Sequence, residues 1–323
     1  MATSPRTEIA EILRRDDGFL VASHANPDGD ALGSIAALGH LLAALGKRFA
    51  LYNESGVPSL YDWLPLPGPV HTEIPAEGFA WTVVMDCGAA HRVGEALERR
   101  LRPEGTINID HHLGNPGFGA VNWVDTTMSS VGEMVAHLAH DLEVPLSGPL
   151  GESVYLAMAT DTGSFTFGNT HPRVLGLAAE IIRQGLDVEA FNHRLLNNWS
   201  PGRLALWSLV LSRTSYAHDA QVGVIRITAA DMAATGTNAL DTDNLVNMVR
   251  RVRGVRVAVS LREDGPRKIK FSLRSTGATN VQAMAATLGG GGHKNAAGGT
   301  VEADMETAEA TVVAAVAKGL GLS

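Results

Sequence analysis

The sequence contains a single cysteine, Cys87, so it cannot form an internal disulfide, and it fits a reducing compartment. It has no uninterrupted apolar run of about 18 residues, and its first residues lack the apolar core of a signal peptide. We therefore expect a cytoplasmic protein with no membrane partner. Cys87 follows an acidic residue at a predicted strand end. A metal ligand or nucleophile is one interpretation, but we favour a small buried core residue.

Positive charge is also scarce: 26 lysines and arginines face 34 acidic residues, which gives a net charge of −8. This balance argues against a protein that coats long nucleic acid with its whole surface. Residues 250–294 hold ten basic and two acidic residues, so this segment carries +8 and the rest of the chain −16. A basic segment beside an acidic body suits an enzyme for small phosphorylated substrates; a solvated charged face is the alternative.

Length and composition are those of an ordinary globular protein. With 323 residues, of which 45% are hydrophobic and 19% charged, the chain can form two domains with separate cores. Strand and helix patterns alternate in the first half, which predicts an α/β fold with an N-terminal, mostly parallel sheet flanked by helices. Ser130 and Glu133 predict a capping box at the start of one helix. Other expected elements are strands near 18–24, 48–53, 82–88 and 106–112 and helices near 31–45, 91–101, 150–160 and 172–185.

The pattern changes near residues 198–203, where the sequence Asn-Trp-Ser-Pro-Gly-Arg interrupts helical segments. We expect a catalytic domain over residues 1–198, a helical linker over 199–220 and a smaller mixed α/β domain over 221–323, with the active site in the cleft between the domains. In the last part, we expect strands over 222–227, 255–261 and 268–275 and helices near 242–253, 280–289 and 305–320.

Acidic residues and histidines recur where apolar segments of the first half end. Because the carboxyl ends of parallel strands meet at one edge of a sheet, these side chains are expected to share a pocket. Turn formation or helix capping explains any one of them alone, but their repetition favours a common site. Carboxylate and imidazole ligands without sulfur suit manganese, magnesium or iron better than structural zinc. The residues are His24, Asp28, Asp30, Asp86, Asp110, His111, His112 and Asp161.

A run of four glycines at 289–292 precedes His293 and Lys294 in the second half. It is not a P-loop, because no Gly-Lys-Ser/Thr follows in register. Backbone amides of such a run can approach an anion closely, while a flexible turn without a ligand is the alternative. Arg274, on a predicted strand, is the best candidate to pair with a terminal phosphate. Arg92 is a second candidate for a substrate phosphate.

The order and position of these motifs resemble the DHH phosphoesterase family over nearly the whole chain. Its four motifs correspond here to His24-Ala-Asn-Pro-Asp28-Gly-Asp30, Asp86, Asp110-His111-His112 and Asp161. The sequence Gly-Gly-Gly-Gly-His at 289–293 is similar to the signature of the DHH-associated domain.

This resemblance implies two divalent metal ions, of which manganese is the first choice and magnesium or iron the alternatives. One ion would be held by His24, Asp28 and Asp86, and the other by Asp30, Asp86, His111 and Asp161. Asp86 would bridge the ions, His112 would face the substrate, and Asp110 would orient a histidine. The implied substrate-binding residues are Arg92, Arg274, Gly290, Gly291, Gly292, His293 and Lys294.

The two-domain form resembles the branch of the family that acts on oligoribonucleotides and on 3′-phosphoadenosine 5′-phosphate (pAp). It implies a manganese-dependent phosphoric ester hydrolase that degrades short oligoribonucleotides (nanoRNA) to mononucleotides and converts pAp to AMP by two-metal water activation. A phosphodiesterase for linear or cyclic dinucleotides and a non-catalytic nucleotide sensor are the alternatives. The expected partners are short single-stranded RNA and pAp, but no long duplex nucleic acid; the oligomeric state, including a homodimer, stays open.

Overall fold

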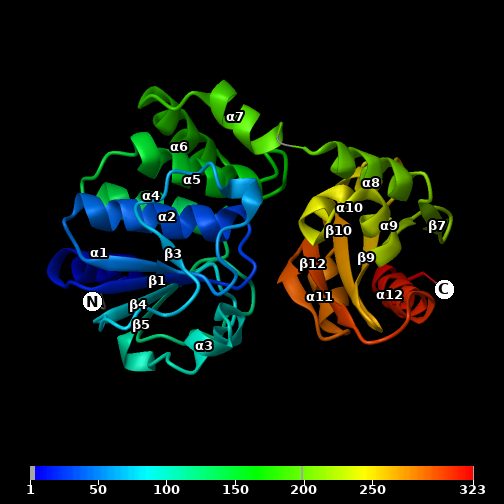
Figure 1. The fold of residues 1–323 in the computed structure, drawn as a ribbon, viewed down its shortest axis with the longest axis horizontal. Coiled ribbons are helices and arrows are strands. Elements are labelled where there is room, and N and C mark those ends of the chain that lie inside the picture. Colours follow the sequence, from blue (N-terminus) through cyan, green and yellow to red (C-terminus); the bar gives the residue numbers. More distant parts are fainter. Residues whose placement is uncertain (1–3, 198, 323) are drawn as a thin grey trace. The chain divides into compact units, whose positions relative to one another are not determined.

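The computed structural model describes residues 4–197 and 199–322. The chain divides into two compact units, one ending at Asn198 and one beginning at Trp199. Each contains a six-stranded sheet with helices on it (Figure 1), which confirms the predicted mixed α/β class. The expected domain bounds stay predictions, and their residues 1, 198 and 323 lie outside the described part of the chain.

The first sheet is parallel throughout, with the strand order β3-β2-β1-β4-β5-β6. The chain order reverses at β1, because β2 lies on one side of it and β4 on the other. In open α/β sheets, the carboxyl ends of the strands at such a switch point form a crevice for ligands. The strands are β1 (Phe19–Ser23), β2 (Phe49–Tyr52), β3 (Val70–His71), β4 (Trp81–Met85), β5 (Thr106–Asp110) and β6 (Val121–Val124).

One face of this sheet carries the main core of the first unit. Phe19 and Val21 of β1 point into that core, since alternate residues of a strand face opposite sides. The helix that follows β1 is almost completely buried, and helices from residues 131–161 pack against it. Figure 1 shows these helices layered on one side of the strands. The helices of the unit on this core are α1 (Pro5–Arg15), α2 (Gly29–Ala44), α4 (Val131–Asp141), α5 (Gly148–Asp161), α6 (Pro172–Arg183) and α7 (Val188–Leu196).

The opposite face of the first sheet has a thinner cover. Leu20 of β1 and Tyr52 of β2 pack there against Leu97 of the short helix α3 (Glu95–Glu98). The prediction of one helix over 91–101 is wrong. Gly94, with a φ of 95°, separates α3 from the 3-10 turn η2 (Ala90–Val93).

The second unit has a mixed sheet with the order β11-β12-β10-β9-β8-β7, in which only the β8–β9 pairing is parallel. Helices α8 (Pro201–Leu211) and α10 (Leu245–Arg250) pack on one face, and α11 (Val281–Ala286) and α12 (Met305–Leu320) on the other. Helix α9 (Ala229–Thr235) follows β8. The strands are β7 (Ser215–Ala217), β8 (Val222–Ile227), β9 (Val257–Gly265), β10 (Lys268–Ser275), β11 (Gly291–His293) and β12 (Ala296–Val301).

Several predicted elements of the second unit differ from the structure. The helix expected near 242–253 is only six residues long, because Asn244 adopts a left-handed conformation just before it. Helix α8 ends at Leu211, and β7 follows it and pairs with β8 in the sheet. Part of the glycine run belongs to β11, a strand that was not predicted.

The predicted capping box of α4 is only half formed. The Ser130 hydroxyl accepts a hydrogen bond from the Glu133 amide, but the Glu133 carboxylate accepts one from the amide of Ser129, not of Ser130. Elements α1, β3 and β6 were not predicted at all. In residues 4–197 and 199–322, no helix is both long and apolar enough to cross a membrane.

Candidate metal centre

His24 and Asp86 lie at the switch point of the first sheet. His24 directly follows β1 and Asp86 directly follows β4, and these strands are neighbours. His24 Nε2 lies 3.6 Å from Asp86 Oδ2, and both side chains are buried. Asp86 has a φ of 52°, a left-handed conformation that turns the chain sharply after β4. The fold therefore brings together two polar side chains that are 62 residues apart in the sequence.

His111, just after β5, contributes an imidazole to the same place. Its Nε2 lies 3.5 Å from Asp30 Oδ2, 3.7 Å from Asp86 Oδ1 and 3.8 Å from Asp161 Oδ2. Its Nδ1 lies 3.1 Å from the carbonyl oxygen of Met128. Because that carbonyl can only accept, Nδ1 carries the proton, and Nε2 is directed to the three carboxylates.

Asp30, in the first turn of α2, is held by the first turn of α4. Its Oδ2 accepts a hydrogen bond from the Val131 amide at 2.8 Å. Its Oδ1 accepts from the Gly132 amide at 3.1 Å and from the Ser34 hydroxyl at 2.8 Å. The amino end of α4 fixes this carboxylate and stabilises its negative charge, but burial and the charge of Asp86 outweigh this effect and raise the pKa of Asp30 well above its usual value.

Asp161, the last residue of α5, is held by an asparagine. The side-chain amide of Asn169 donates to Asp161 Oδ2 at 3.3 Å, to the Asp161 carbonyl at 3.1 Å and to the Ser129 carbonyl at 3.0 Å. Asn169 thus ties Asp161 to the segment just before α4, whose Met128 carbonyl also positions His111.

Three sets of donor atoms include Asp86. Two of them are His24, Asp28 and Asp86, and Asp30, Asp86 and His111; the third is Asp86, Asp110 and His112. Within each set the donor atoms lie within 4.8 Å of one another. Asp86 Oδ1 is buried and makes no hydrogen bond with any described residue. An orphaned carboxylate oxygen in such a position is costly unless a cation binds it. The first two sets match the ligand sets implied by the family resemblance except that the second lacks Asp161, and the ligand roles stay predictions.

Charge is balanced by protons within this cluster. Burial opposes ionisation of Asp86, but the histidines His24, His112 and His111 outweigh it and hold the pKa of Asp86 below its usual value. Burial, together with the Asp86 charge, raises the pKa of Asp161 to about 6 despite the opposing charge of His111. Burial opposes protonation of His111, yet the three surrounding carboxylates raise its pKa to about 9. A divalent cation would displace these protons and supply the missing positive charge.

The donor set fits hard or borderline divalent cations. Carboxylate oxygens and imidazole nitrogens are the ligands that manganese and magnesium take in proteins. Cys87 is fully buried, and its thiol donates to the Ala89 carbonyl at 3.1 Å. Burial raises the pKa of Cys87 to about 12, so its thiol is protonated at neutral pH. The interpretation of Cys87 as a core residue is confirmed.

Asp110 orients His112. Its Oδ1 accepts a hydrogen bond from His112 Nδ1 at 2.8 Å, while its Oδ2 accepts from the Asn115 amide at 2.6 Å. His112 Nδ1 also lies 3.5 Å from Asp86 Oδ1. With the Nδ1 proton bound to Asp110, His112 presents Nε2 as its second polar atom.

Arg92 lies near the first ligand set. Its carbonyl accepts the amide of Ala25, the residue after His24, at 2.7 Å. Burial disfavours protonated His24, but Asp86 and Asp28 raise its pKa above the usual value, and the charge of Arg92 opposes them. The exposed Arg92 side chain is thus within electrostatic reach of the cluster.

In the second unit, Arg274 and His293 share a row across the sheet. Ala296 of β12 is the register partner of Arg274 on β10 and of His293 on β11. Register partners point to the same face of a sheet, so the two cationic side chains flank a small alanine about 10 Å apart. Lys294 follows β11 and is exposed.

Two glycines of the run are required by the backbone of the sheet. A Cβ on Gly290 would lie 2.3 Å from the Gly298 carbonyl oxygen, and one on Gly292 would lie 2.5 Å from the Ala296 carbonyl oxygen. Gly292 also has a φ of 132°. Gly289 and Gly291 face open space. Close strand packing therefore accounts for Gly290 and Gly292, and their predicted part in binding an anion remains untested.

Three supporting residues were missed in the sequence: Asn115, Asn169 and Arg173. Arg173 Nε donates to the buried carboxylate of Glu133. Asparagines are common in loops, so nothing in the local pattern distinguished these two. Their partners lie up to 46 residues away in the sequence, and only the fold brings them together.

Comparison with known proteins places the chain in a family. Residues 18–158 match the DHH family, N-terminal domain, and residues 220–318 match the DHHA1 domain. The bifunctional oligoribonuclease and PAP phosphatase NrnA of Thermus thermophilus is 35% identical over 97% of this chain and 93% of its own length. The chain belongs to the DHH family. A DHH relative of the same name from Bacillus subtilis is 27% identical over 92% of this chain and 93% of its own length.

Solved structures show the same fold. The crystal structure of an exopolyphosphatase-related protein from Bacteroides fragilis is 27% identical, with a TM-score of 0.87 over 97% of this chain and 96% of that one. RecJ from Thermus thermophilus, solved in complex with Mn²⁺, is 16% identical, with a TM-score of 0.54; the match covers this whole chain and 56% of RecJ. This DHH-family chain is an enzyme, a phosphoric ester hydrolase.

Proposed function

We propose that this enzyme uses two divalent metal ions, in the first place manganese, to hydrolyse short oligoribonucleotides to mononucleotides and to convert pAp to AMP. The names of the Thermus thermophilus and Bacillus subtilis relatives support these two substrates. The observation that carries the metal part of the proposal is Asp86, a buried carboxylate shared by two sets of donor atoms.

Residues of the first unit would bind the metal ions and contact the phosphoryl group. Two divalent cations bound at this centre would supply an activated water and Lewis acidity toward a phosphoryl group. His24, Asp28 and Asp86 would hold one cation, and Asp30, Asp86, His111 and Asp161 the other. Asp110 keeps the proton of His112 on Nδ1. His112 Nε2 would therefore be the atom that contacts a phosphoryl oxygen or the leaving group.

The second unit would contribute the grip on the substrate. Arg274 carries a planar guanidinium that suits paired hydrogen bonds to phosphate oxygens. His293, in the same row, together with Lys294 and the amide of Gly291, adds further donors for a phosphate. Gly290 and Gly292 would then serve by letting β11 approach β12, and Arg92 would add positive charge from the first unit.

The decisive experiment compares phosphate release from pAp with cleavage of 5′-labelled RNAs that range from dinucleotides to a few tens of nucleotides, with and without Mn²⁺. We expect turnover of pAp and of the shortest RNAs that depends on Mn²⁺ and falls with RNA length. Preference for long RNA would contradict the proposal. Turnover of linear or cyclic dinucleotides alone would instead identify a dinucleotide phosphodiesterase.

A variant of the shared ligand tests the two-metal arrangement. Asp86→Asn keeps the shape of the side chain but removes its charge, and we expect it to lose at least a thousandfold in turnover of both substrates. Asp62→Asn, at an exposed position of the same unit, is the matched control and should retain full activity. Substantial activity in Asp86→Asn would rule out a bridging role for Asp86.

Compartment and assembly stay predictions. We expect the enzyme to work in the cytoplasm on single-stranded substrates and not on long duplexes. Light scattering on the purified protein would decide between a monomer and a homodimer.

A further inference from the structure

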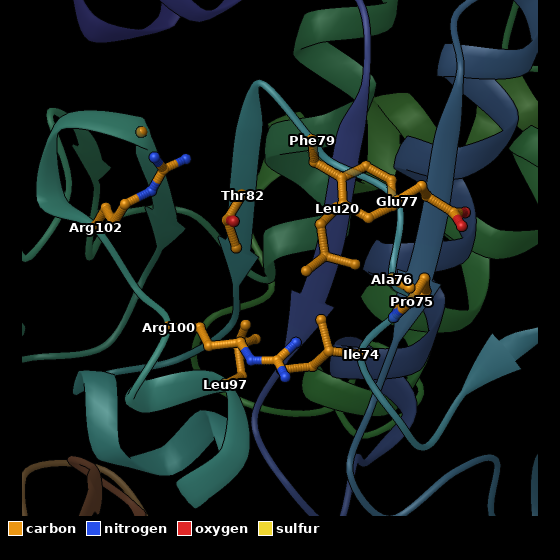
Figure 2. Close-up of a pocket in the computed structure, with 11 residues that line it drawn as sticks. Leu20, Ile74, Pro75, Ala76, Glu77, Phe79, Thr82, Leu97, Arg100 and Arg102 are labelled. Atoms are coloured by element: carbon orange, nitrogen blue, oxygen red, sulfur yellow. The ribbon is translucent and has the colours of Figure 1, made fainter.

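A pocket of about 370 Å³ opens on the thinly covered face of the first sheet (Figure 2). Leu20 of β1 and Thr82 of β4, which are register partners, form its floor. Figure 2 shows the segment 74–79 on one side of this floor and Arg100 and Arg102 on the other.

The pocket follows from how this face is covered. Both faces of a parallel sheet normally lie under helices. Here the segment between β3 and β4 is irregular and contains Pro75 and Gly78, and α3 is only four residues long. Between these short elements a pocket remains over the first halves of β1 and β4, at Leu20 and Thr82.

The walls combine apolar surface with positive charge. Ile74, Phe79 and Leu97 give the pocket an apolar lining beside Leu20. Arg100 and Arg102 are exposed, and neither side chain is in a hydrogen bond or ion pair within the described part of the chain. Glu77 is the acidic residue of the lining, so the pocket carries one net positive charge.

The Arg100 side chain makes no ion pair within the described part of the chain, whereas the adjacent Arg99 forms one with Glu95. The hydroxyl of Tyr52 is buried, and Tyr52 belongs to the apolar cluster that contains Leu20 and Leu97. This hydroxyl lacks a hydrogen-bond partner among the residues described. Burial and Glu54 raise the pKa of Tyr52, while the charge of Arg100 lowers it, so Arg100 lies within electrostatic reach of this hydroxyl.

The pocket is separate from the metal centre. Leu20 precedes His24 by four residues on β1, which corresponds to about 13 Å along a strand. Thr82 has the same separation from Asp86 on β4. A ligand over Leu20 and Thr82 would therefore bind beside the middle of the strands, away from their carboxyl ends.

We propose that this pocket binds a small anion with a flat apolar body, the chemistry shared by nucleoside monophosphates and aromatic carboxylates. Its volume lies in the range of about 300–1,000 Å³ that is typical of small-molecule sites. The guanidinium groups of Arg100 and Arg102 suit either a phosphate or a carboxylate, and the apolar lining would hold the body of the ligand.

A fluorescence titration with 8-anilinonaphthalene-1-sulfonate, a flat apolar sulfonate, tests the site. The protein is kept in EDTA, so that anions do not bind through metal ions. We expect one saturable site that is weakened at least tenfold in the double variant Arg100→Gln/Arg102→Gln. Arg99→Gln, beside Arg100 just after α3 but already paired with Glu95, is the matched control and should bind like the wild type. Circular dichroism checks that all variants are folded.

Displacement then identifies the class of ligand. In separate arms, AMP and 1-naphthoate compete with the bound probe: displacement by AMP alone indicates nucleotides, and displacement by naphthoate alone indicates carboxylates. Filling the pocket from its rim with Ala76→Trp should abolish binding of the probe. Equal binding of the probe by wild type and the double variant would overturn the proposal. So would a lack of displacement by either competitor, because the pocket would then bind the probe only.

Discussion

Asn115 is a single residue whose side chain links several polar groups of the centre. Its amide donates to Asp110 Oδ2 at 2.6 Å, to Asn108 Oδ1 at 2.9 Å and to the Cys87 carbonyl at 3.2 Å. Asp110 in turn fixes His112. Outer hydrogen bonds of this kind typically change activity by about 10–100-fold. We expect Asn115→Ala to lower kcat for pAp by this factor with little change in KM, as measured by steady-state phosphate release.

The control for this variant is Asn122→Ala. Asn122 is also an asparagine that holds a loop, but its hydrogen bonds go to the backbone of Gly119 and not to the cluster. It should leave kcat nearly unchanged. If both variants reduced kcat equally, loop stability rather than the position of His112 would explain the loss.

Cys87 gives a second prediction at the scale of one residue. Its thiol is buried and has its pKa raised to about 12 by that burial, so almost none is thiolate at neutral pH. Because the thiolate is the reactive form, iodoacetamide should leave the folded protein unmodified and alkylate it only after unfolding. Intact-protein mass spectrometry measures this directly. Rapid alkylation of the native protein would show that Cys87 is accessible and ionised.

At the scale of elements, the start of α4 supports much of the centre. Its amides bind Asp30, and the segment just before it bonds His111 and Asn169 through backbone carbonyls. That segment is itself anchored by the buried carboxylate of Glu133, which accepts hydrogen bonds from the Ser129 amide and from the exposed Arg173. Arg173 also donates to the Thr127 carbonyl. This ion pair thus helps to place three predicted ligands.

This anchor predicts a pH-dependent contribution to stability. Burial would raise the pKa of Glu133, but hydrogen bonds from His137, Arg173 and Ser129 lower it to about 2. The unfolded chain has a glutamate pKa of about 4.3, so it takes up the proton first as the pH falls. The stabilisation, about 2–3 kcal/mol, is therefore complete above about pH 5 and lost toward pH 2.

The measurement is urea unfolding of wild type and Glu133→Gln at a series of pH values. The variant should be less stable at pH 7, and the difference should shrink as the pH falls below about 4. Glu73→Gln, at an exposed loop position, should show no such difference. A gap between wild type and Glu133→Gln that stays constant with pH would contradict the assigned role of the carboxylate.

Some elements were predicted because their sequence signals are local. Others were missed because they depend on backbone conformation or on distant residues. Strand β1 and helix α2 follow from an apolar run, an Asx turn and a helical pattern, all of which are local. The helix is interrupted at Gly94, which has a positive φ, and a single glycine in the sequence does not predict that conformation. The half-formed capping box reflects the surroundings of Glu133, whose carboxylate binds the Ser129 amide and Arg173, forty residues further along the chain.

For the whole molecule, sequence order alone predicted an α/β fold and a shared pocket, because strand ends in parallel sheets converge. It did not predict the strand order, which puts β4 beside β1 and so brings Asp86 next to His24. Nor did it predict that amides from α4 would bind Asp30, a contact across 101 residues. Polar residues at strand ends can be predicted from local sequence patterns. The hydrogen bonds that orient their side chains cannot, because they join residues far apart in the sequence.

Three of the acidic residues outside residues 250–294 should make the stability of the first unit depend on bound cations. Asp30, Asp86 and Asp161 surround the imidazole of His111. A cation that binds there only in the folded state stabilises that state by mass action. At a Mn²⁺ concentration about 100 times Kd, this amounts to about 2.7 kcal/mol. For a unit of this size, that raises Tm by about 5–10 °C over the protein in EDTA.

Calorimetry with EDTA or Mn²⁺ measures that shift in the transition of the first unit. Asp86→Asn removes the donor that both sets share, so it should lose most of the shift, whereas Asp62→Asn, an exposed acidic position, should keep it. Because this readout needs no substrate, it separates metal binding from catalysis. A full shift in Asp86→Asn would mean that the cation binds elsewhere, even if that variant were inactive.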